Sequence, residues 1–372
     1  MSKVRIGRRA AIGLAAAGTV AAVQRRAHGE AKAGGAKAGE PNASEANAGQ
    51  AKSGEANAMQ AAARREASLT WYVAQVDTET AEGFGSAFSA AHPGITVEVI
   101  RTTGQVAFER LMLDLKNGTP HCDVFSATDI AHMAILRDHN ALMAFTPENF
   151  AGMRPEFKTE SEVGWYYPTN AGRWALVRNK DKVTQQAAPK AWTDLLDPRW
   201  KGRVSVAHPA FSGGAGVWAL AVKKLHGWAF FEALAKNDPR VGRSTLDTVT
   251  LLGAAECLVG PTWAPGAYRA VDKGAPITLD QPSDGVVLMT FPSAIPAGAP
   301  HPNAAKLFME WLLSEDYSRL IAAQGSEPIH AGVAPRADQP ALDQQKVVSL
   351  TVEEIRKGVP ELVEQWRDTF GG

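Results

Sequence analysis

The side chains best placed to bind a ligand follow predicted strands and precede predicted helices. Residues 211–216 read Phe-Ser-Gly-Gly-Ala-Gly, come after a short strand predicted at 204–206, and open a helix. Ser212 is a favourable N-cap, and Gly213 and Gly214 allow backbone amides to approach a bound group. Because free N–H groups and the helix dipole both favour negative charge, this turn predicts an anion-binding site. The alternative is an ordinary helix cap.

Other polar and aromatic residues occupy equivalent places in the chain. Gln75 follows the first predicted strand, whereas Ser126 and Thr128 follow the third one and precede a helix. Such hydroxyls either bind a ligand or cap the helix, and the sequence leaves both roles open. Trp263 follows a strand in the second half, and Tyr268 comes soon after it. If these aromatic rings line the site, the ligand has an apolar or aromatic body.

Known catalytic motifs are missing from the sequence. It contains no His-Glu-x-x-His zinc motif, no Gly-x-Ser-x-Gly nucleophile turn and no P-loop. A dispersed catalytic triad has no fixed spacing and is not excluded on this ground. We expect a binding protein without a cofactor, with an exported enzyme as the alternative.

The elements that position these residues alternate between strand and helix. Strands are predicted at 69–73, 95–100 and 122–126, and helices at 80–91, at 105–116 and from Asp129 onward. This alternation predicts an α/β lobe with a largely parallel sheet, in which ligands bind beyond the carboxyl ends of the strands. The second half repeats the style, with strands at 174–177, 204–206, 256–259 and 277–279, helices at 215–235 and 303–322, and a long apolar run at 286–295 that crosses between lobes.

Composition limits the classes of function. The 372 residues carry 39 basic and 39 acidic side chains, so the formal net charge is zero. A nucleic-acid binder needs a basic excess, and we expect no such partner. About 300 residues remain after the N-terminal region, more than one core usually organises, so two lobes are expected. Cys122 and Cys257 are interpreted as buried free thiols, with a single bridge as the alternative.

The N-terminus carries the features of an export signal. Arg8 and Arg9 precede a weakly apolar stretch at 10–23, and residues 27–29 offer small side chains for cleavage. This pattern predicts a twin-arginine signal peptide over 1–29 and a periplasmic location, with a cytosolic amphipathic N-terminus as the alternative. Residues 30–66 are rich in Ala, Gly, Lys, Glu and Asn and predict a disordered linker; a transient Ala-rich helix is the competing interpretation.

Three further stretches carry a resemblance to a known family. They lie at 120–126 (Pro-His-Cys-Asp-Val-Phe-Ser), 192–204 and 301–314. In this order they resemble the family of extracellular solute-binding proteins that serve ABC importers for ferric iron, phosphonates, thiamine and polyamines. The resemblance covers residue 69 to the end. It implies an α/β, two-lobed type II periplasmic binding protein fold with a hinge and an interlobe cleft, with one lobe at 69–170 and 285–372 and the other at 171–284.

The resemblance also bears on the ligand. Where ferric-iron members carry a histidine and an acidic ligand, this chain has Val76 and Thr128, and of the tandem tyrosines only a displaced Tyr268 remains. Arg173 matches a family position whose arginine binds an anion in the cleft, and a guanidinium binds carboxylate or phosphate in bidentate fashion. The alternative for Arg173 is a structural pairing across the hinge.

These inferences define one expected function and its rivals. We expect a monomeric periplasmic receptor that binds a small organic anion (a carboxylate, phosphonate or phosphate ester) and delivers it to an ABC-transporter permease. The expected contacts are Gln75, Ser126, Thr128, Arg173, Ser212, Gly213, Gly214, Trp263 and Tyr268. An iron or iron-chelate receptor is the main alternative. A polyamine receptor is a further one, and it requires carboxylates such as Asp77 or Asp284 in the cleft.

Overall fold

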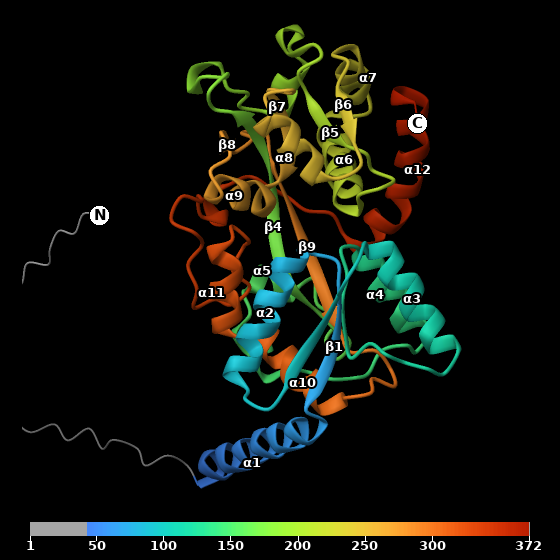
Figure 1. Ribbon diagram of the computed structural model, residues 1–372, viewed down its shortest axis with the longest axis vertical. Helices are drawn as coiled ribbons and strands as arrows, with labels where there is room; N and C mark the ends of the chain where they lie inside the picture. Colours follow the sequence, from blue (N-terminus) through green and yellow to red (C-terminus); the bar gives the residue numbers. More distant parts are fainter. Residues whose placement is uncertain (1–42, 372) are drawn as a thin grey trace, which may run out of the picture. The chain divides into compact units, whose positions relative to one another are not determined.

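The computed structural model describes residues 43–371 (Figure 1). The predicted signal peptide and the first part of the predicted linker, residues 30–42, lie outside the described residues. The chain divides into residues 1–50 and a compact unit formed by 51–372. Within residues 43–371, no helix is both long enough and apolar enough to cross a membrane.

Helices and strands alternate along the described chain. The helices are α1 (Ala43–Glu66), α2 (Thr78–Ala91), α3 (Gly104–Lys116), α4 (Ile130–Asp138), α5 (Pro155–Lys158), α6 (Gly213–His226), α7 (Ala229–Lys236), α8 (Thr245–Gly253), α9 (Ala264–Asp272), α10 (Pro302–Leu312), α11 (Glu315–Ala323) and α12 (Val352–Phe370). The strands are β1 (Ser68–Val73), β2 (Thr96–Arg101), β3 (Val124–Ser126), β4 (Tyr166–Asn179), β5 (Ser205–Ala207), β6 (Arg240–Gly242), β7 (Val259–Trp263), β8 (Ile277–Asp280), β9 (Val286–Ala294) and β10 (Val347–Val348).

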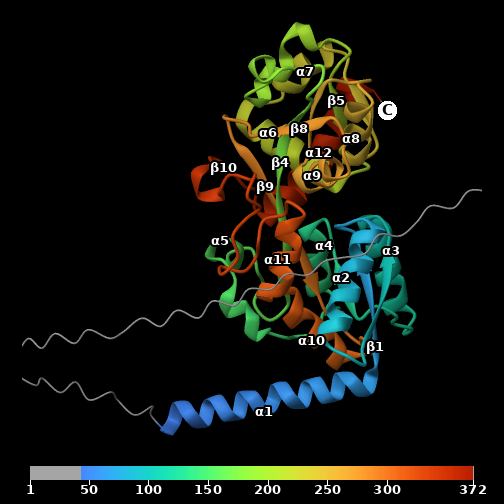
Figure 2. The same ribbon diagram turned by 60° about the vertical axis from the view of Figure 1, so that its left-hand side comes forward.

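Two long strands connect the lobes. The main sheet has the order β2-β1-β3-β9-β4-β7, with β1, β2 and β3 parallel and β9 antiparallel to both β3 and β4. Figures 1 and 2 show β4 and β9 running side by side from one lobe into the other. The predicted crossing at 286–295 is therefore β9, and the strand predicted at 174–177 is part of the longer β4.

Each lobe buries apolar side chains on both faces of its part of the sheet. In β1, Leu69, Trp71 and Val73 pack in one core while Tyr72 points to the opposite one, as the two-residue period of a strand requires. The same alternation in β4 assigns its even-numbered residues 174 and 176 to one core of the second lobe and residues 175 and 177 to the other. These cores explain why every residue of β4 and β9 is buried.

Three predicted elements differ from those observed. The helix predicted at 215–235 is two helices, because Gly227 adopts a φ of 73° between α6 and α7. The helix predicted at 303–322 is also two, since Ser314 accepts a hydrogen bond from the amide of Tyr317 and begins α11. The strand predicted at 256–259 begins only at Val259, where pairing with β4 starts.

The C-terminal helix corrects the expected lobe boundary. Residues 285–372 were assigned to the first lobe, but Leu362 and Trp366 of α12 are buried in the core that contains Trp174 and Trp218 of the second lobe. The Trp366 ring packs 5.6 Å from that of Phe231 on α7. The chain therefore returns to the second lobe after the α10–α11 segment.

The linker prediction also needs correction. Residues 43–66 form helix α1, which matches the competing interpretation of an Ala-rich helix. The Glu66 carboxylate accepts hydrogen bonds from the amides of Asn303 and Ala304, the latter at 2.7 Å, so it caps α10. Ala63 is buried in the first-lobe core. Helix α1 has few large apolar residues with which to form a core of its own, and these tertiary contacts hold its C-terminal end.

Cys122 and Cys257 are both buried and free, as expected. The Cys122 thiol donates to the carbonyl of Val124 at 3.2 Å.

Candidate functional site

The first turns of two helices, one from each lobe, meet at Thr128. Gly104 opens α3 in the first lobe, and any side chain at this position would collide with Thr128 Oγ1. Gly213 opens α6 in the second lobe, and a Cβ there would lie 3.9 Å from the same oxygen. Thr128 is half-buried between β3 and α4. A hydroxyl and two positive helix ends therefore converge where the lobes face each other.

The two helix ends differ in how they are capped. Ser212 accepts a hydrogen bond from the amide of Ala215 at 3.4 Å, as the sequence predicts for an N-cap. Thr103 precedes α3 but makes no side-chain capping bond. Gly214 packs toward Trp174 and Met289. The α3 end was missed from the sequence, although Thr103 and Gly104 follow β2 directly and satisfy the same strand-to-helix rule.

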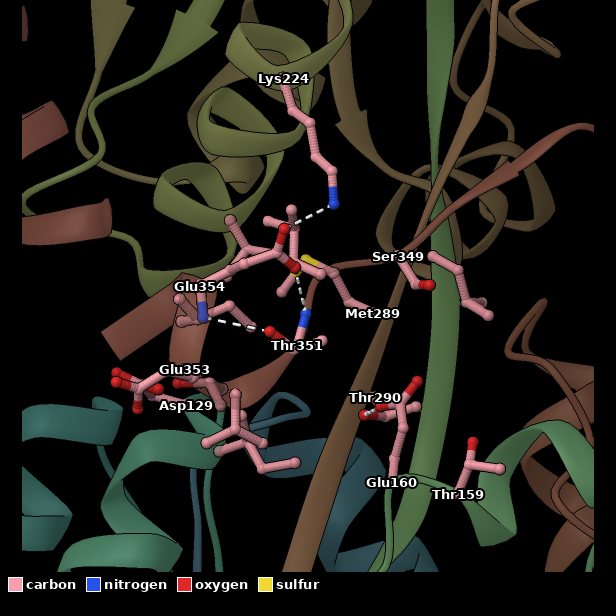
Figure 3. A pocket seen from close by; sticks show the side chains of 17 residues that line it. Asp129, Thr159, Glu160, Lys224, Met289, Thr290, Ser349, Thr351, Glu353 and Glu354 are labelled. Atoms are coloured by element: carbon pink, nitrogen blue, oxygen red, sulfur yellow. Dashed lines mark hydrogen bonds and ion pairs between the residues drawn. The ribbon is translucent and has the colours of Figure 1, made fainter. Parts of the chain in front are cut away.

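A cavity of about 640 Å³ lies beside Thr128, between α6, β9 and the start of α12 (Figure 3). Its lining includes the carboxylates of Asp129, Glu160, Glu353 and Glu354, and one lysine, Lys224. Most of these charges already have partners. Asp129 accepts from the amide of Ala131 at 2.8 Å, and Lys224 Nζ lies 2.6 Å from Glu354 Oε1.

The Glu160 carboxylate of this cavity is bonded to a hydroxyl group rather than to a cation. It accepts a hydrogen bond from the Thr290 hydroxyl of β9, and Figure 3 shows these two side chains next to each other. Burial raises the pKa of the Glu160 carboxyl, and the Thr290 hydrogen bond opposes that rise. Sequence reasoning missed this residue because it follows a short helix rather than a strand.

Ser126 is held in a chain of hydroxyl groups inside the sheet. Its Oγ accepts from Trp71 Nε1 at 2.8 Å and lies 2.6 Å from Ser293 Oγ, which in turn contacts Thr169. All four residues are fully or almost fully buried. The Ser126 hydroxyl therefore joins β1, β3, β4 and β9, and its hydrogen-bonding capacity is used within the protein.

Arg173 is paired inside the protein, which is the arrangement that the structural alternative described. Its Nε and Nη2 lie 2.6 and 2.5 Å from Glu327 Oε1, and Nη1 donates to the carbonyl of Pro340 at 3.0 Å. Gln339 also donates to Glu327. The Arg173 side chain is fully buried. The anion that its guanidinium binds in this structure is the carboxylate of Glu327.

The two aromatic candidates pack against the chain. Trp263 lies over Gly172, where a Cβ would come within 2.6 Å of the indole, and its ring is 4.8 Å from that of Phe291. The Tyr268 ring is covered by the guanidinium of Arg336 at 4.9 Å and packs on Gly325. Burial raises the pKa of Tyr268 to about 12. Trp263 remains half-exposed, whereas Tyr268 is buried.

Gln75 lies where the first lobe faces α9 of the second. It is 8% exposed, and neither atom of its side-chain amide has a hydrogen-bond partner among the described residues. Two residues later, Asp77 Oδ2 lies 3.1 Å from Arg269 Nε of α9. Glu79 pairs with Lys273 of the same helix at 2.8 Å. Two ion pairs therefore cross between the lobes beside Gln75.

The carboxylates considered for a polyamine are engaged. Asp77 pairs with Arg269 and accepts from the amide of Thr80 at 2.9 Å. Asp284 accepts from the amide of Trp192 and from His226 Nε2 at 2.9 Å. Within the described part of the chain, no three His, Cys, Asp or Glu side chains gather in a way that holds a metal ion.

Curated relatives share part of the sequence. A spermidine/putrescine-binding periplasmic protein of Escherichia coli is 24% identical over 60% of this chain and 65% of its own length. An uncharacterized protein of Haemophilus influenzae is 28% identical over 50% and 56% respectively, and iron uptake protein A1 of Synechocystis is 23% identical over 65% and 71%. The chain thus matches less than two thirds of the length of the first two.

Solved structures share the fold, and a family model matches the sequence. Iron-bound HitA from Pseudomonas aeruginosa has a TM-score of 0.69 at 20% identity, covering 81% of this chain and 99% of that one. The periplasmic binding protein AfuA from Actinobacillus pleuropneumoniae, with fructose-6-phosphate bound, has a TM-score of 0.70 at 20% identity, covering 81% and 98%. The two-lobed α/β fold is therefore that of periplasmic binding proteins. Because the family model matches residues 120–358, the chain belongs to the bacterial extracellular solute-binding protein family.

Proposed function

We propose that this protein is the periplasmic substrate-binding component of an ABC importer and binds a small organic anion between its lobes. The observation that carries the proposal is the meeting of Gly104, Thr128 and Gly213. Backbone amides at the starts of α3 and α6 offer positive ends to one negative group, and the Thr128 hydroxyl donates between them. Family membership supports a receptor that binds a solute and does not transform it.

The proposed contacts divide into two groups. Thr128, Ser212, Gly213 and Gly214 surround the anionic head, and Gln75 and Trp263 lie along the rest of the ligand. The side chains of Ser126, Arg173 and Tyr268 belong to the wall behind these contacts, because their polar groups are engaged or buried in the protein. Closure of the lobes would remove water from the head group and strengthen its hydrogen bonds.

The proposal includes export to the periplasm. The Arg8-Arg9 pair and the mild apolar stretch after it support delivery to the periplasm through the twin-arginine pathway. A permease in the inner membrane is the proposed partner, and a monomer is the proposed state. Fusion of residues 1–29 to a reporter whose export depends on that pathway tests the route.

A cationic ligand is the second candidate, favoured by one specific observation. The cavity beside Thr128 is lined by four carboxylates and one lysine, and a matched relative is named for spermidine and putrescine. Against it, all four carboxylates have partners within the protein. Ferric iron is less favoured, because Tyr268 is buried under Arg336 with a raised pKa, which opposes a phenolate ligand.

A thermal-shift screen of the mature protein separates these ligands. Any ligand that binds the native state raises the melting temperature, and the stabilisation grows with the logarithm of its concentration relative to Kd. We expect organic phosphates or carboxylates to raise it while spermidine and ferric citrate do not. Stabilisation by amines alone, or a visible absorption band on adding ferric citrate, would overturn the anion proposal.

A further inference from the structure

The side chain of Gln75 has a property that the anion site alone does not explain. It is more than nine-tenths buried, yet neither Nε2 nor Oε1 has a partner within the described residues. A buried amide without hydrogen bonds is unfavourable, because it has lost its contacts with water and gained none in return. Apolar residues of similar size would avoid this cost, so an unpartnered glutamine at this depth indicates a group that comes from outside the chain.

The chain on both sides of Gln75 faces the meeting point of the lobes. The amide of Ala74 donates to the backbone carbonyl of Ser126 at 3.2 Å, and a Cβ on Gly104 would lie 3.9 Å from the Ala74 methyl group. On the other side, Asp77 pairs with Arg269 across the cleft at 3.1 Å. Gln75 thus lies between the first turn of α3, where the anionic head is placed, and the contact with α9.

We propose that Gln75 binds a hydroxyl group of the ligand, so that the ligand is a hydroxylated organic phosphate or a chemically similar hydroxylated anion. This inference rests on the proposed anion site and names its ligand class. An amide offers both a donor and an acceptor, and a hydroxyl group satisfies both at once, whereas an alkyl chain satisfies neither. The aromatic body that Trp263 and Tyr268 suggested is disfavoured, because Tyr268 is buried beneath Arg336.

Two ligands that differ only in their hydroxyl groups test the inference. Glycerol 3-phosphate and n-propyl phosphate carry the same head group and chain length. In isothermal titration of the mature protein we expect glycerol 3-phosphate to bind at least about tenfold more tightly, the value of two neutral hydrogen bonds. Fructose 6-phosphate serves as a larger hydroxylated probe. Equal affinities for all three overturn the hydroxyl inference and leave the anion proposal intact.

The variant Gln75→Met gives an independent readout. Methionine has a similar length and no polar group, so the variant should bind glycerol 3-phosphate and n-propyl phosphate with nearly equal affinity. Because an unpartnered amide is removed, the empty variant should melt at the same temperature as the wild type or higher. Preserved preference, or a clear loss of stability, overturns the role of Gln75.

A partnered glutamine provides the control. Gln365 on α12 accepts a hydrogen bond from Lys223 Nζ at 2.9 Å, and Gln365→Met should leave the ligand preference unchanged without raising the melting temperature. If neither phosphate esters nor organic carboxylates bind the wild type in the first place, the proposed function itself fails and not merely the hydroxyl inference. The two failures are therefore distinguishable.

Discussion

Replacing Glu327 by alanine should destabilise the protein by about 3–5 kcal/mol, the usual cost of leaving one partner of a buried ion pair uncompensated. Arg173 and Glu327 are 0% and 1% exposed, and two guanidinium nitrogens lie within 2.6 Å of one carboxylate oxygen. Removing the carboxylate would leave the guanidinium with one remaining protein acceptor, the carbonyl of Pro340. The loss of stability is large because the Arg173 guanidinium would stay buried without its negative partner.

Urea unfolding followed by tryptophan fluorescence measures this change. The matched control is Glu256→Ala, which breaks the Arg240–Glu256 pair, whose side chains are 53% and 54% exposed. That exposed pair should contribute less than about 1 kcal/mol. The double variant Arg173→Met with Glu327→Leu should recover much of the loss, because it removes both charges and keeps the volume.

A Glu327→Ala loss no larger than that of the control would refute the buried pairing. The same series separates structure from binding. If Arg173 acts only through Glu327, the double variant should bind the ligand with nearly the wild-type affinity. Loss of binding in a stably folded double variant would restore Arg173 as a direct ligand contact.

Three further predictions follow from individual contacts. Burial raises the pKa of Glu160, so the folded protein retains a proton that the unfolded chain releases, and wild-type stability should fall as the pH rises through the folded-state pKa. Glu160→Gln should remove this part of the pH dependence of the free energy of unfolding, measured in urea. An unchanged dependence on pH would contradict the prediction. Gly104→Ala should lower the melting temperature by clashing with Thr128 Oγ1, and Thr128→Ala should restore most of it; a clash elsewhere would leave the double variant no better. Arg269→Ala should weaken ligand binding about fivefold at low salt, because it removes the ion pair with Asp77 that connects the two lobes. Lys273→Ala removes the exposed pair with Glu79 and should not weaken binding. Equal effects of the two variants on affinity would show that the Arg269–Asp77 pair does not favour closure.

Much of the fold follows from local patterns in the sequence. The apolar, β-branched runs at β1, β2 and β9 predict strands within a residue or so of those observed, because such side chains favour a pleated strand. The breaks at Gly227 and Ser314 were readable as helix-ending and helix-starting residues. The lobe assignment of α12 was not, because amphipathic helices reveal an apolar face and not the core that receives it.

The site was predictable where a strand meets a helix and not where distant residues pair. Thr128, Ser212 and Gly213 were found from their places in the chain, and the structure brings Thr128 and Gly213 together. The partner of Arg173 was not found, because Glu327 is 154 residues away and no local pattern connects them. Long-range pairs of this kind depend on the folded topology.

The most direct test of an anion site between the lobes is the affinity of Gly213→Asp for phosphate esters. A Cβ at this position has no neighbour closer than 3.9 Å, so a side chain can begin here without a clash, and an acidic residue in the first turn favours α6. We predict an unchanged or higher melting temperature together with at least about a tenfold loss of affinity for glycerol 3-phosphate, because like charges in a cleft repel. An undiminished affinity of the variant for the phosphate ester would contradict an anion site between the lobes. Binding of spermidine by the wild type that becomes tighter in the variant would contradict it as well.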